Sequence, residues 1–361
     1  MPSASPQEAP GQTRTRIGAA VIAALVAALV VCFGLHLATG SVFIPLRDVI
    51  AVLIGGEPEK AVWAEIILQF RLPRTITAVL AGAALAISGL QMQTLFRNPL
   101  ADPFVLGISA GASLGVAIVA LGASGLGLAA AMAAAGIGAD ISIAAGASLG
   151  AAAVFLVVML VARRVESNMT LLILGIMFGY VTSAVVSVLM HFSVAEQVHG
   201  FVIWTFGSFA GVTWGELTVL APIATVGLLI GIGLIKPLNA LLLGSQYARS
   251  MGLSVGAARF FIIGSTSLLA GVVTAFCGPI GFLGIAVPHL CRSMLLTSDH
   301  RVLVPCCILL GAVVAILADI VAQLPGTSAV LPLNAVTSLV GAPFVIWIIL
   351  RQRNLGASFG S

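Results

Sequence analysis

The chain has 361 residues, of which 60% are hydrophobic and only 8% carry a charge. Soluble domains have about 25% charged residues because water must wet their surface. The mean hydropathy of +1.17 therefore excludes an ordinary soluble domain and indicates an integral membrane protein. The sequence pI of about 9.0 does not indicate nucleic-acid binding, because the 16 Lys and Arg residues are spread along the chain and form no basic patch.

Residues 1–16 are rich in Pro, Ser, Gln and Ala, a composition that predicts a disordered tail. The apolar stretch that follows, residues 17–37, is long enough to cross a bilayer at about 20 residues per crossing. We therefore predict a first transmembrane helix and not a cleaved signal peptide.

Apolar stretches of helix length recur along the rest of the chain and predict an all-α membrane protein with about ten transmembrane helices. Nine and eleven are alternatives, because the eighth stretch is short and residues 121–139 could hold an extra helical piece. Residues 191–216 are expected to form an amphipathic surface segment, with Trp204 and Trp214 as interface anchors. The predicted spans are residues 17–37, 75–95, 104–122, 141–162, 169–190, 217–235, 260–277, 280–296, 302–322 and 335–350.

The distribution of basic residues predicts that both chain ends are cytoplasmic. With the N-terminus inside, the inner segments hold twelve of the 16 basic residues and four of the 12 acids. The outer segments then hold the other four basic residues and the other eight acids. A threefold excess of Lys and Arg is what the positive-inside rule requires of cytoplasmic segments.

Two sequence features concern how the helices are arranged. Glycines at four-residue spacing in residues 107–115 (GISAGASLG) and 144–150 (AAGASLG) predict closely packed helices. The similarity between residues 103–109 (PFVLGIS) and 280–288 (IGFLGIAVP) suggests that spans 2–5 and 7–10 form an inverted repeat, as in many transporters.

The spans have few of the groups that catalysis, ion coupling or metal binding would need. Asp319 is the one acid well inside a predicted span, and a helix contact is a more common role for such a residue than a proton relay. The five Cys and five His residues have no metal-ligand spacing, so we predict no metal site, no catalytic residues and no cofactor bound by this chain. These features indicate a passage for a sizeable solute that is driven by a partner protein.

Residues 236–259 form the longest polar interruption on the predicted cytoplasmic side. Two parts of it, LNALLLG and YARSMGL, are each expected to form a short helix that ends near Gly244 or Gly252. A plain solvated loop is the alternative.

Five stretches of the sequence resemble the FecCD-type permeases, the membrane subunits of binding-protein-dependent ATP-driven importers for iron-siderophores, haem and vitamin B12. They keep their order over most of the chain. They are residues 71–115, 204–214 (WTFGSFAGVTW), 244–259 (GSQYARSMGLSVGAAR), 278–301 (GPIGFLGIAVPHLCR to DHR) and 331–351 (LPLNAVTSLVGAPFVIWIILR).

The resemblance implies a single permease domain (residues 17–353) with a short cytoplasmic tail (354–361) in the bacterial inner membrane. It also implies a homodimer, two ATPase subunits that carry the ATP and Mg²⁺, and a periplasmic or lipid-anchored solute-binding protein. Residues 236–259 then correspond to the cytoplasmic coupling loop that inserts into the ATPase. Its expected contact residues are Gly244, Tyr247, Ala248, Arg249, Met251, Gly252 and Leu253.

Two arginines, Arg71 and Arg74, match family positions that receive acidic side chains of the binding protein; helix capping or snorkelling is the alternative. The chain has Gln323 where the vitamin B12 member has a third docking arginine, and Val330 where an acid is common before Leu-Pro.

The segment at residues 91–100 (QMQTLFRNPL) contains a helix-breaking Asn-Pro pair and is a candidate inner gate. Core packing is an equal alternative for Met92 and Phe96. The gate candidates are Gln91, Met92, Phe96, Asn98 and Pro99.

The solute is expected to be an iron-siderophore, because residues 97–103 (RNPLADP) resemble siderophore-type members. Vitamin B12 and haem are the alternatives. A stand-alone secondary carrier or channel is the competing function from a different class.

Overall fold

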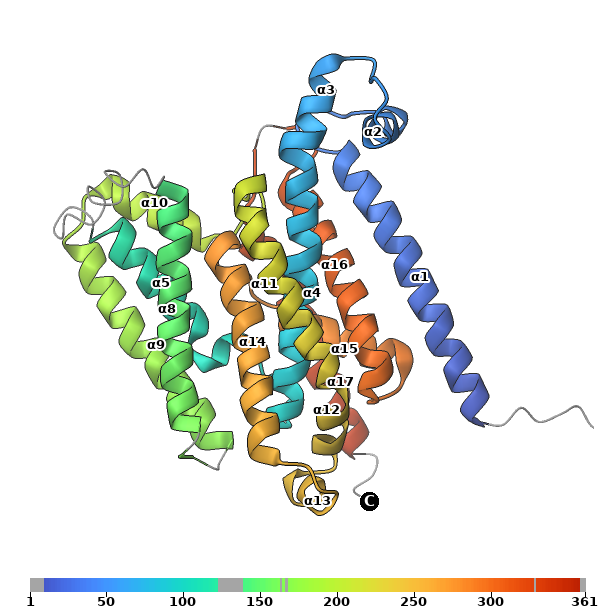
Figure 1. Ribbon diagram of the computed structural model, residues 1–361, viewed down its shortest axis with the longest axis vertical. Helices are drawn as coiled ribbons and strands as arrows, with labels where there is room; N and C mark the ends of the chain where they lie inside the picture. The colour runs from blue at the N-terminus through green and yellow to red at the C-terminus, as the bar shows by residue number, and fades with distance from the viewer. Residues whose placement is uncertain (1–9, 123–138, 163, 166–167, 328, 358–361) are drawn as a thin grey trace, which may run out of the picture.

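A computed structural model describes residues 10–122, 139–162, 164–165, 168–327 and 329–357. All regular structure in these ranges is helical, and the long helices stand side by side (Figure 1). Among the described residues, seven helical segments are long and apolar enough to cross a membrane, one of them α3, η1 and α4 taken together, and α5 and α15 are shorter apolar helices. The helices are α1 (Pro10–Ala38), α2 (Leu46–Leu53), α3 (Ala61–Glu65), η1 (Ile66–Arg71), α4 (Leu72–Phe96), η2 (Pro103–Leu106), α5 (Ile108–Ala120), α8 (Ala139–Ala162), α9 (Asn168–His191), α10 (Ala195–Thr205), α11 (Trp214–Gly233), α12 (Ile235–Leu242), α13 (Ser245–Ser250), α14 (Val255–Cys277), α15 (Leu283–Leu295), α16 (His300–Ala322) and α17 (Leu333–Ala357).

Each of the ten predicted spans coincides with one helix, with ends that differ by a few residues. The largest differences are at the two ends of the chain. Residues 10–16 of the predicted N-terminal tail belong to α1, and α17 continues to Ala357, into the predicted C-terminal tail. Residues 1–9 and 358–361, like most of the segment in which an extra helical piece was possible, lie outside the described residues.

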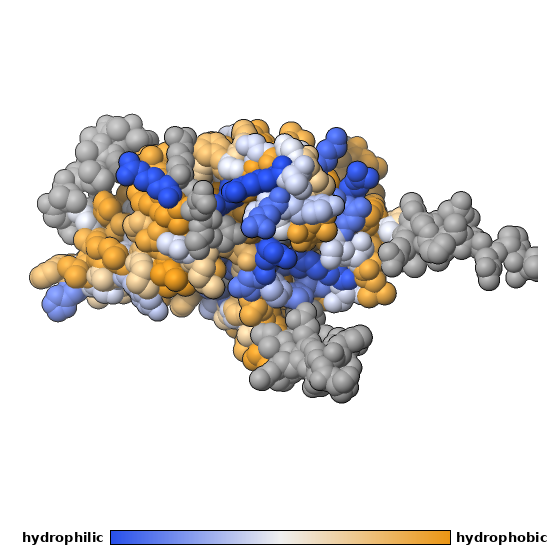
Figure 2. All heavy atoms as spheres, turned by 90° about the horizontal axis from the view of Figure 1, so that it is seen from below, coloured by the Kyte–Doolittle hydropathy of each residue, from blue (hydrophilic) through white to orange (hydrophobic). Residues whose placement is uncertain are grey.

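We call the end of the molecule that has α2 and α3 the upper end, and the end that has α13 the lower end. Helix α1 begins at the lower end and α17 finishes there (Figure 1). Figure 2 views the lower face, where hydrophilic side chains gather near the middle among hydrophobic ones.

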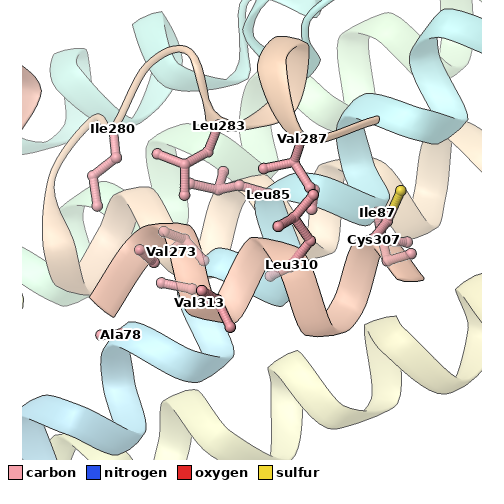
Figure 3. Close-up of a cluster of buried hydrophobic side chains, with 14 of the residues drawn as sticks. Ala78, Leu85, Ile87, Val273, Ile280, Leu283, Val287, Cys307, Leu310 and Val313 are labelled. Carbon is pink, nitrogen blue, oxygen red and sulfur yellow. The ribbon is translucent and has the colours of Figure 1, made fainter. Parts of the chain in front are cut away.

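Helix α4 is the centre of the bundle, and its residues from Ala81 to Leu95 are all buried. It packs against α14, α15, α16 and α11. Side chains of α4, α14, α15 and α16 meet in this core, where Leu85 of α4 lies near Leu283 of α15 (Figure 3). The helix ends where predicted, because Arg97 takes a left-handed conformation (φ 50°) just before the Asn-Pro pair.

Glycines bring several helices into backbone contact. A Cβ on Gly115 would overlap the carbonyl oxygen of Gly146, and one on Gly150 would overlap that of Gly111. The predicted close packing of these two glycine segments is therefore confirmed, between α5 and α8. The pairs Gly82–Gly311 and Gly89–Gly284 join α4 to α16 and α15 in the same way.

The segment predicted to lie on the surface contains α10 and the start of α11. The indole nitrogen of Trp204 is buried, and its ring stacks on Phe201 at a centroid distance of 6.2 Å. Trp204 is partly exposed and also packs against the core, so its expected anchor role stays a prediction. Trp214 is partly exposed and donates a hydrogen bond from Nε1 to the carbonyl oxygen of Leu68 at 2.8 Å.

Candidate functional site

At the upper end, five polar side chains from α1, α4 and α16 form a buried cluster. Arg74 donates from Nε and Nη2 to the two carboxylate oxygens of Asp319, at 2.7 and 2.9 Å. His36 contacts Asp319 at 2.7 Å with Nε2 and Thr75 at 2.7 Å with Nδ1. Gln323 donates to Asp319 at 3.1 Å. We call these five residues the upper polar cluster; in it Asp319 has the helix-contact role expected from the sequence.

Arg71 lies beside this cluster and holds the connection between α1 and α2. Its Nη1 donates to the carbonyl oxygen of Leu37 at 2.7 Å, and its Nη2 donates to that of Val42. The ion pair of Arg74 with Asp319 is strengthened by its hydrogen bonds and by the exclusion of water. The hydrogen bonds that Arg71 donates to backbone carbonyls instead fix the path of the chain. The two predicted docking arginines therefore have structural partners within this chain, and Gln323, at the third docking position, is half buried.

At the lower end, residues 236–259 contain the two short helices expected from the sequence, α12 and α13. Gly244 (φ 104°) and Gly252 (φ 83°) stand before and after α13 in backbone conformations that favour glycine. Ala248 is fully buried and holds α13 against the core. The plain-loop alternative is therefore wrong.

Exposed apolar side chains lie in and beside α13 among polar ones, and they differ in part from the prediction. Tyr247 and Met251 are more than half exposed, as expected for contact residues. Leu253 packs against the core, and Leu243, just before α13, is a further large exposed apolar side chain. Arg249 is exposed.

Three cavities open at the lower end, and Arg97 lines all of them. The cavity between α4 and α15 has a volume of about 360 Å³ and includes Arg292. A second, of about 430 Å³, includes Arg249 and Arg259, and a third, of about 570 Å³, lies against Gly244 and Tyr247. We call these the lower cavities.

The predicted gate residues take different positions. Gln91 is buried and bonded to α14: its Nε2 donates to Ser265 Oγ at 3.1 Å, and its Oε1 accepts from Thr266 Oγ1 at 2.7 Å. Met92 is fully buried and Phe96 packs against the same core, which supports core packing for both. Asn98 accepts a hydrogen bond from the Leu100 N–H at 3.0 Å, and Pro99 lines a lower cavity.

The next turn of α4 has polar contacts that the sequence did not reveal. Gln93 accepts from Arg292 of α15 at 2.5 Å. Thr94 contacts His300 Nε2 of α16 at 2.9 Å, and His300 Nδ1 contacts Asn239 of α12 at 2.8 Å. This lower polar network joins residues 236–259, through Asn239, to α4 and α16. Only the DHR motif at residues 299–301 pointed to it in the sequence.

Two acids lie near this network. Partial burial acts to raise the pKa of Asp299, but hydrogen bonds from the Arg301 N–H and from Asn239 outweigh it, so the pKa is below its ordinary value. Burial raises the pKa of Asp102 to about 6, although the Phe104 N–H donates to its carboxylate at 2.8 Å. Among the described residues, no three His, Cys, Asp or Glu side chains are placed to hold a metal ion.

Comparison with known proteins assigns the chain to a family. The FecCD transport family model matches residues 22–351. The vitamin B12 import system permease protein BtuC of Salmonella paratyphi A is 40% identical over 286 residues, which is 79% of this chain and 83% of that protein. The protein of the same name from Klebsiella pneumoniae is 39% identical over 292 residues, which is 80% of this chain and 84% of that one.

One solved structure is similar over nearly the whole chain. It is described, provisionally, as an inward-facing conformation of a metal-chelate type ABC transporter. The TM-score is 0.79 and the sequence identity 28%, and the match covers 92% of this chain and 99% of that one. Family model, curated relatives and structure agree, and the chain belongs to the FecCD transport family.

Proposed function

We propose that this chain is the permease subunit of an ATP-driven importer in a bacterial inner membrane. In this proposal two copies form the passage, and two ATPase subunits, which bind the ATP and Mg²⁺, dock at the lower end. A solute-binding protein docks at the upper end. The observation that carries the proposal is α13, a short helix set between two glycines of positive φ at the lower end, with Tyr247 exposed on it and Met251 exposed directly after it.

The proposed orientation places the lower end in the cytoplasm. Helix α1 starts and α17 finishes at that end, and basic side chains such as Arg97, Arg249 and Arg292 line its cavities. A cytoplasmic excess of basic residues agrees with the positive-inside rule.

The proposed inverted repeat has support in two matching short helices. Both α5 and α15 have 13 residues, and both begin directly after a left-handed residue, Gly107 (φ 77°) and Phe282 (φ 69°). Each follows a long helix, α4 or α14, as the repeat of spans 2–5 and 7–10 requires.

For the cargo, we propose a metal chelate, with vitamin B12 as the first candidate. The curated relatives named above are vitamin B12 permeases, and they favour this alternative over the iron-siderophore predicted from residues 97–103. An iron-siderophore and haem remain candidates, since the similar solved structure is described by the broader metal-chelate class.

For the pathway, we propose that the lower part of α4 belongs to the inner gate. The side chains of Gln91, Gln93 and Thr94 are all hydrogen-bonded to neighbouring helices, so movement of those helices would change their partners. Asn98 and Pro99 would form its cytoplasmic rim. Polar groups without fixed charge suit a passage that a large solute must leave as readily as it enters.

The decisive experiment is reconstitution of the chain in liposomes with its ATPase and binding protein. We expect ATP-dependent uptake of cobalamin, and parallel assays with a ferric siderophore and with haem rank the three cargoes. Uptake by the chain alone under a proton gradient, without ATPase, would instead establish a secondary carrier.

A further inference from the structure

Helix α2 presents an apolar surface that no other part of the described structure covers. Large apolar side chains in and beside the helix are between 45% and 79% exposed. A soluble surface rarely leaves a contiguous patch of this kind open to water. We call this surface the α2 stripe; it consists of Phe43, Leu46, Ile50, Leu53 and Ile54.

The helix has three distinct faces. At about 100° per residue, Leu46, Ile50 and Leu53 fall on one line. The buried residues Val49 and Val52 fall on a second line, about a third of a turn away, and pack against α1 and η1. The side chain of Arg47, 74% exposed, points about a quarter turn from the stripe on its other side.

This arrangement is held rigidly. Arg47 forms an ion pair with Glu59 at 2.6 Å, and Asp48 accepts a hydrogen bond from the Glu59 N–H at 3.0 Å. Arg71 fixes the chain just before the helix through the carbonyl oxygens of Leu37 and Val42. The stripe therefore cannot turn inward to hide its apolar side chains.

The stripe continues the exposed apolar side of α1. Val30, Val31 and Leu35 are exposed on α1, one of the helices long enough to cross a membrane. The two helices touch where Leu46 lies 3.4 Å from the Cβ position of Gly34. One apolar surface thus runs from the middle of α1 to α2, and the charges of Arg47 and Glu59 lie beside it.

We propose that α2 lies in the membrane surface, with the stripe in the lipid and Arg47 in the water. The occupant of the stripe is the boundary between acyl chains and headgroups, into which an amphipathic helix inserts by about 5–10 Å. An interfacial helix turns one side to lipid and another to protein and directs its charged side chains toward water, which agrees with the separate directions of the stripe, of the buried Val49 and Val52 and of Arg47. The proposal rests on the membrane location of the chain and not on its cargo.

Spin labels on single cysteines test the position of α2. The labelled sites are Ile50 and Leu53 in the stripe, Val30 on α1 as the lipid reference and Glu57 as the exposed water reference. The five native cysteines are buried, and labelling of the unchanged chain measures their background. In liposomes, collision with oxygen reports lipid and collision with a water-soluble nickel chelate reports water.

We expect labels at Ile50 and Leu53 to collide with oxygen in preference to nickel, as at Val30, while the label at Glu57 shows the reverse. Nickel collision at both stripe positions would overturn the proposal. So would low collision with both reagents, which would mean that protein covers the stripe. A stripe shielded only after the binding protein is added would assign the surface to that partner instead. None of these readouts depends on uptake, so failure of transport would leave the test intact.

Discussion

The two ends of the protein use their arginines in opposite ways. At the upper end, Arg71 donates to two backbone carbonyls and Arg74 to the carboxylate of Asp319. At the lower end, Arg97 and Arg249 line a cavity whose described lining includes no acid. A cation that is neutralised within the fold holds helices together, whereas one beside an open cavity is available to a partner. The same residue type therefore indicates stability at one end and docking at the other.

The largest effect is expected from Gly252→Val, which tests whether the lower end transmits motion. The surroundings of Gly252 are open, so valine meets no steric clash, but its left-handed backbone becomes strained by about 1–3 kcal/mol. Because this strain would alter the connection between α13 and α14, we expect uptake by the reconstituted complex to fall at least about tenfold. Gly256→Val is the control, because Gly256 is equally open but has no left-handed backbone. Equal uptake in both variants would contradict the proposed coupling role.

Arg74→Ala tests whether the upper end is a structural clamp. It leaves the carboxylate of Asp319 buried, with its ion pair and both hydrogen bonds from Arg74 removed, so the free energy of unfolding should fall by about 3–5 kcal/mol. Thermal unfolding of the purified protein measures this change. Arg74→Met combined with Asp319→Leu should recover much of the loss, because it removes both charges. An unchanged melting temperature for Arg74→Ala would show that the cluster does not hold α1, α4 and α16 together.

Arg249→Glu is the matching change at the lower end. Because Arg249 is exposed, we expect the melting temperature to remain nearly the same. Association with the ATPase should weaken several-fold, more strongly at low salt, because a contact between charges is screened by ions. Binding of the ATPase to the variant, measured at two salt concentrations, provides the check. A lower melting temperature with unchanged ATPase binding would mean that Arg249 stabilises the fold and does not contact the partner.

Asp102→Asn tests the acid that directly precedes η2 and accepts a hydrogen bond from the backbone. Its pKa is about 6 in the folded protein and 3.8 ordinarily, so the folded state holds a proton that the unfolded state has lost between these values. Stability therefore falls as the pH rises through this window and is constant above it. Asparagine keeps an oxygen to accept from the Phe104 N–H. We expect the variant to melt a few degrees higher above pH 6, with the difference vanishing below pH 3.8.

The smallest effect is expected at the proposed docking site. Nη1 and Nη2 of Arg71 already donate to backbone carbonyl oxygens, and surface ion pairs contribute only about 0–1 kcal/mol. Arg71→Ala should weaken docking of the binding protein by a few-fold at most, and less at high salt. Affinity for the reconstituted complex measures this; a loss of a hundredfold would mean that Arg71 is a principal contact.

The sequence predicts the long helices well because each is an apolar run of bilayer length. It also predicts the end of α4 at the Asn-Pro pair and the short helices around Gly244. Helices α2 and α3 could not be predicted with the same ease, because they have only eight and five residues and their apolar side chains do not form a span.

The polar contacts are the part that the sequence could not provide. His36 and Asp319 are 283 positions apart, and Thr94 and His300 are 206 apart. His36 and Asp319 are single polar residues in apolar stretches, which gives no signal for a partner, and the polar residues around Thr94 and His300 do not show which of them meet. For Arg71 and Arg74, residue type alone suggests helix capping or snorkelling as the alternative to docking, but only the fold shows which atoms they contact.

The glycine contacts divide the bundle into two bodies. Helices that meet backbone to backbone have no side chains between them that could repack, so α4, α15 and α16 should move as one unit. The α5–α8 pair forms a second unit for the same reason. The contacts of α14 with α5 and α8 are less close. A Cβ added to Gly271 of α14 would lie 3.6 Å from Ala151 and 3.8 Å from Ile108, which are ordinary van der Waals distances. We expect the sliding that accompanies alternating access to concentrate along this seam, leaving the glycine contacts on either side of it unchanged.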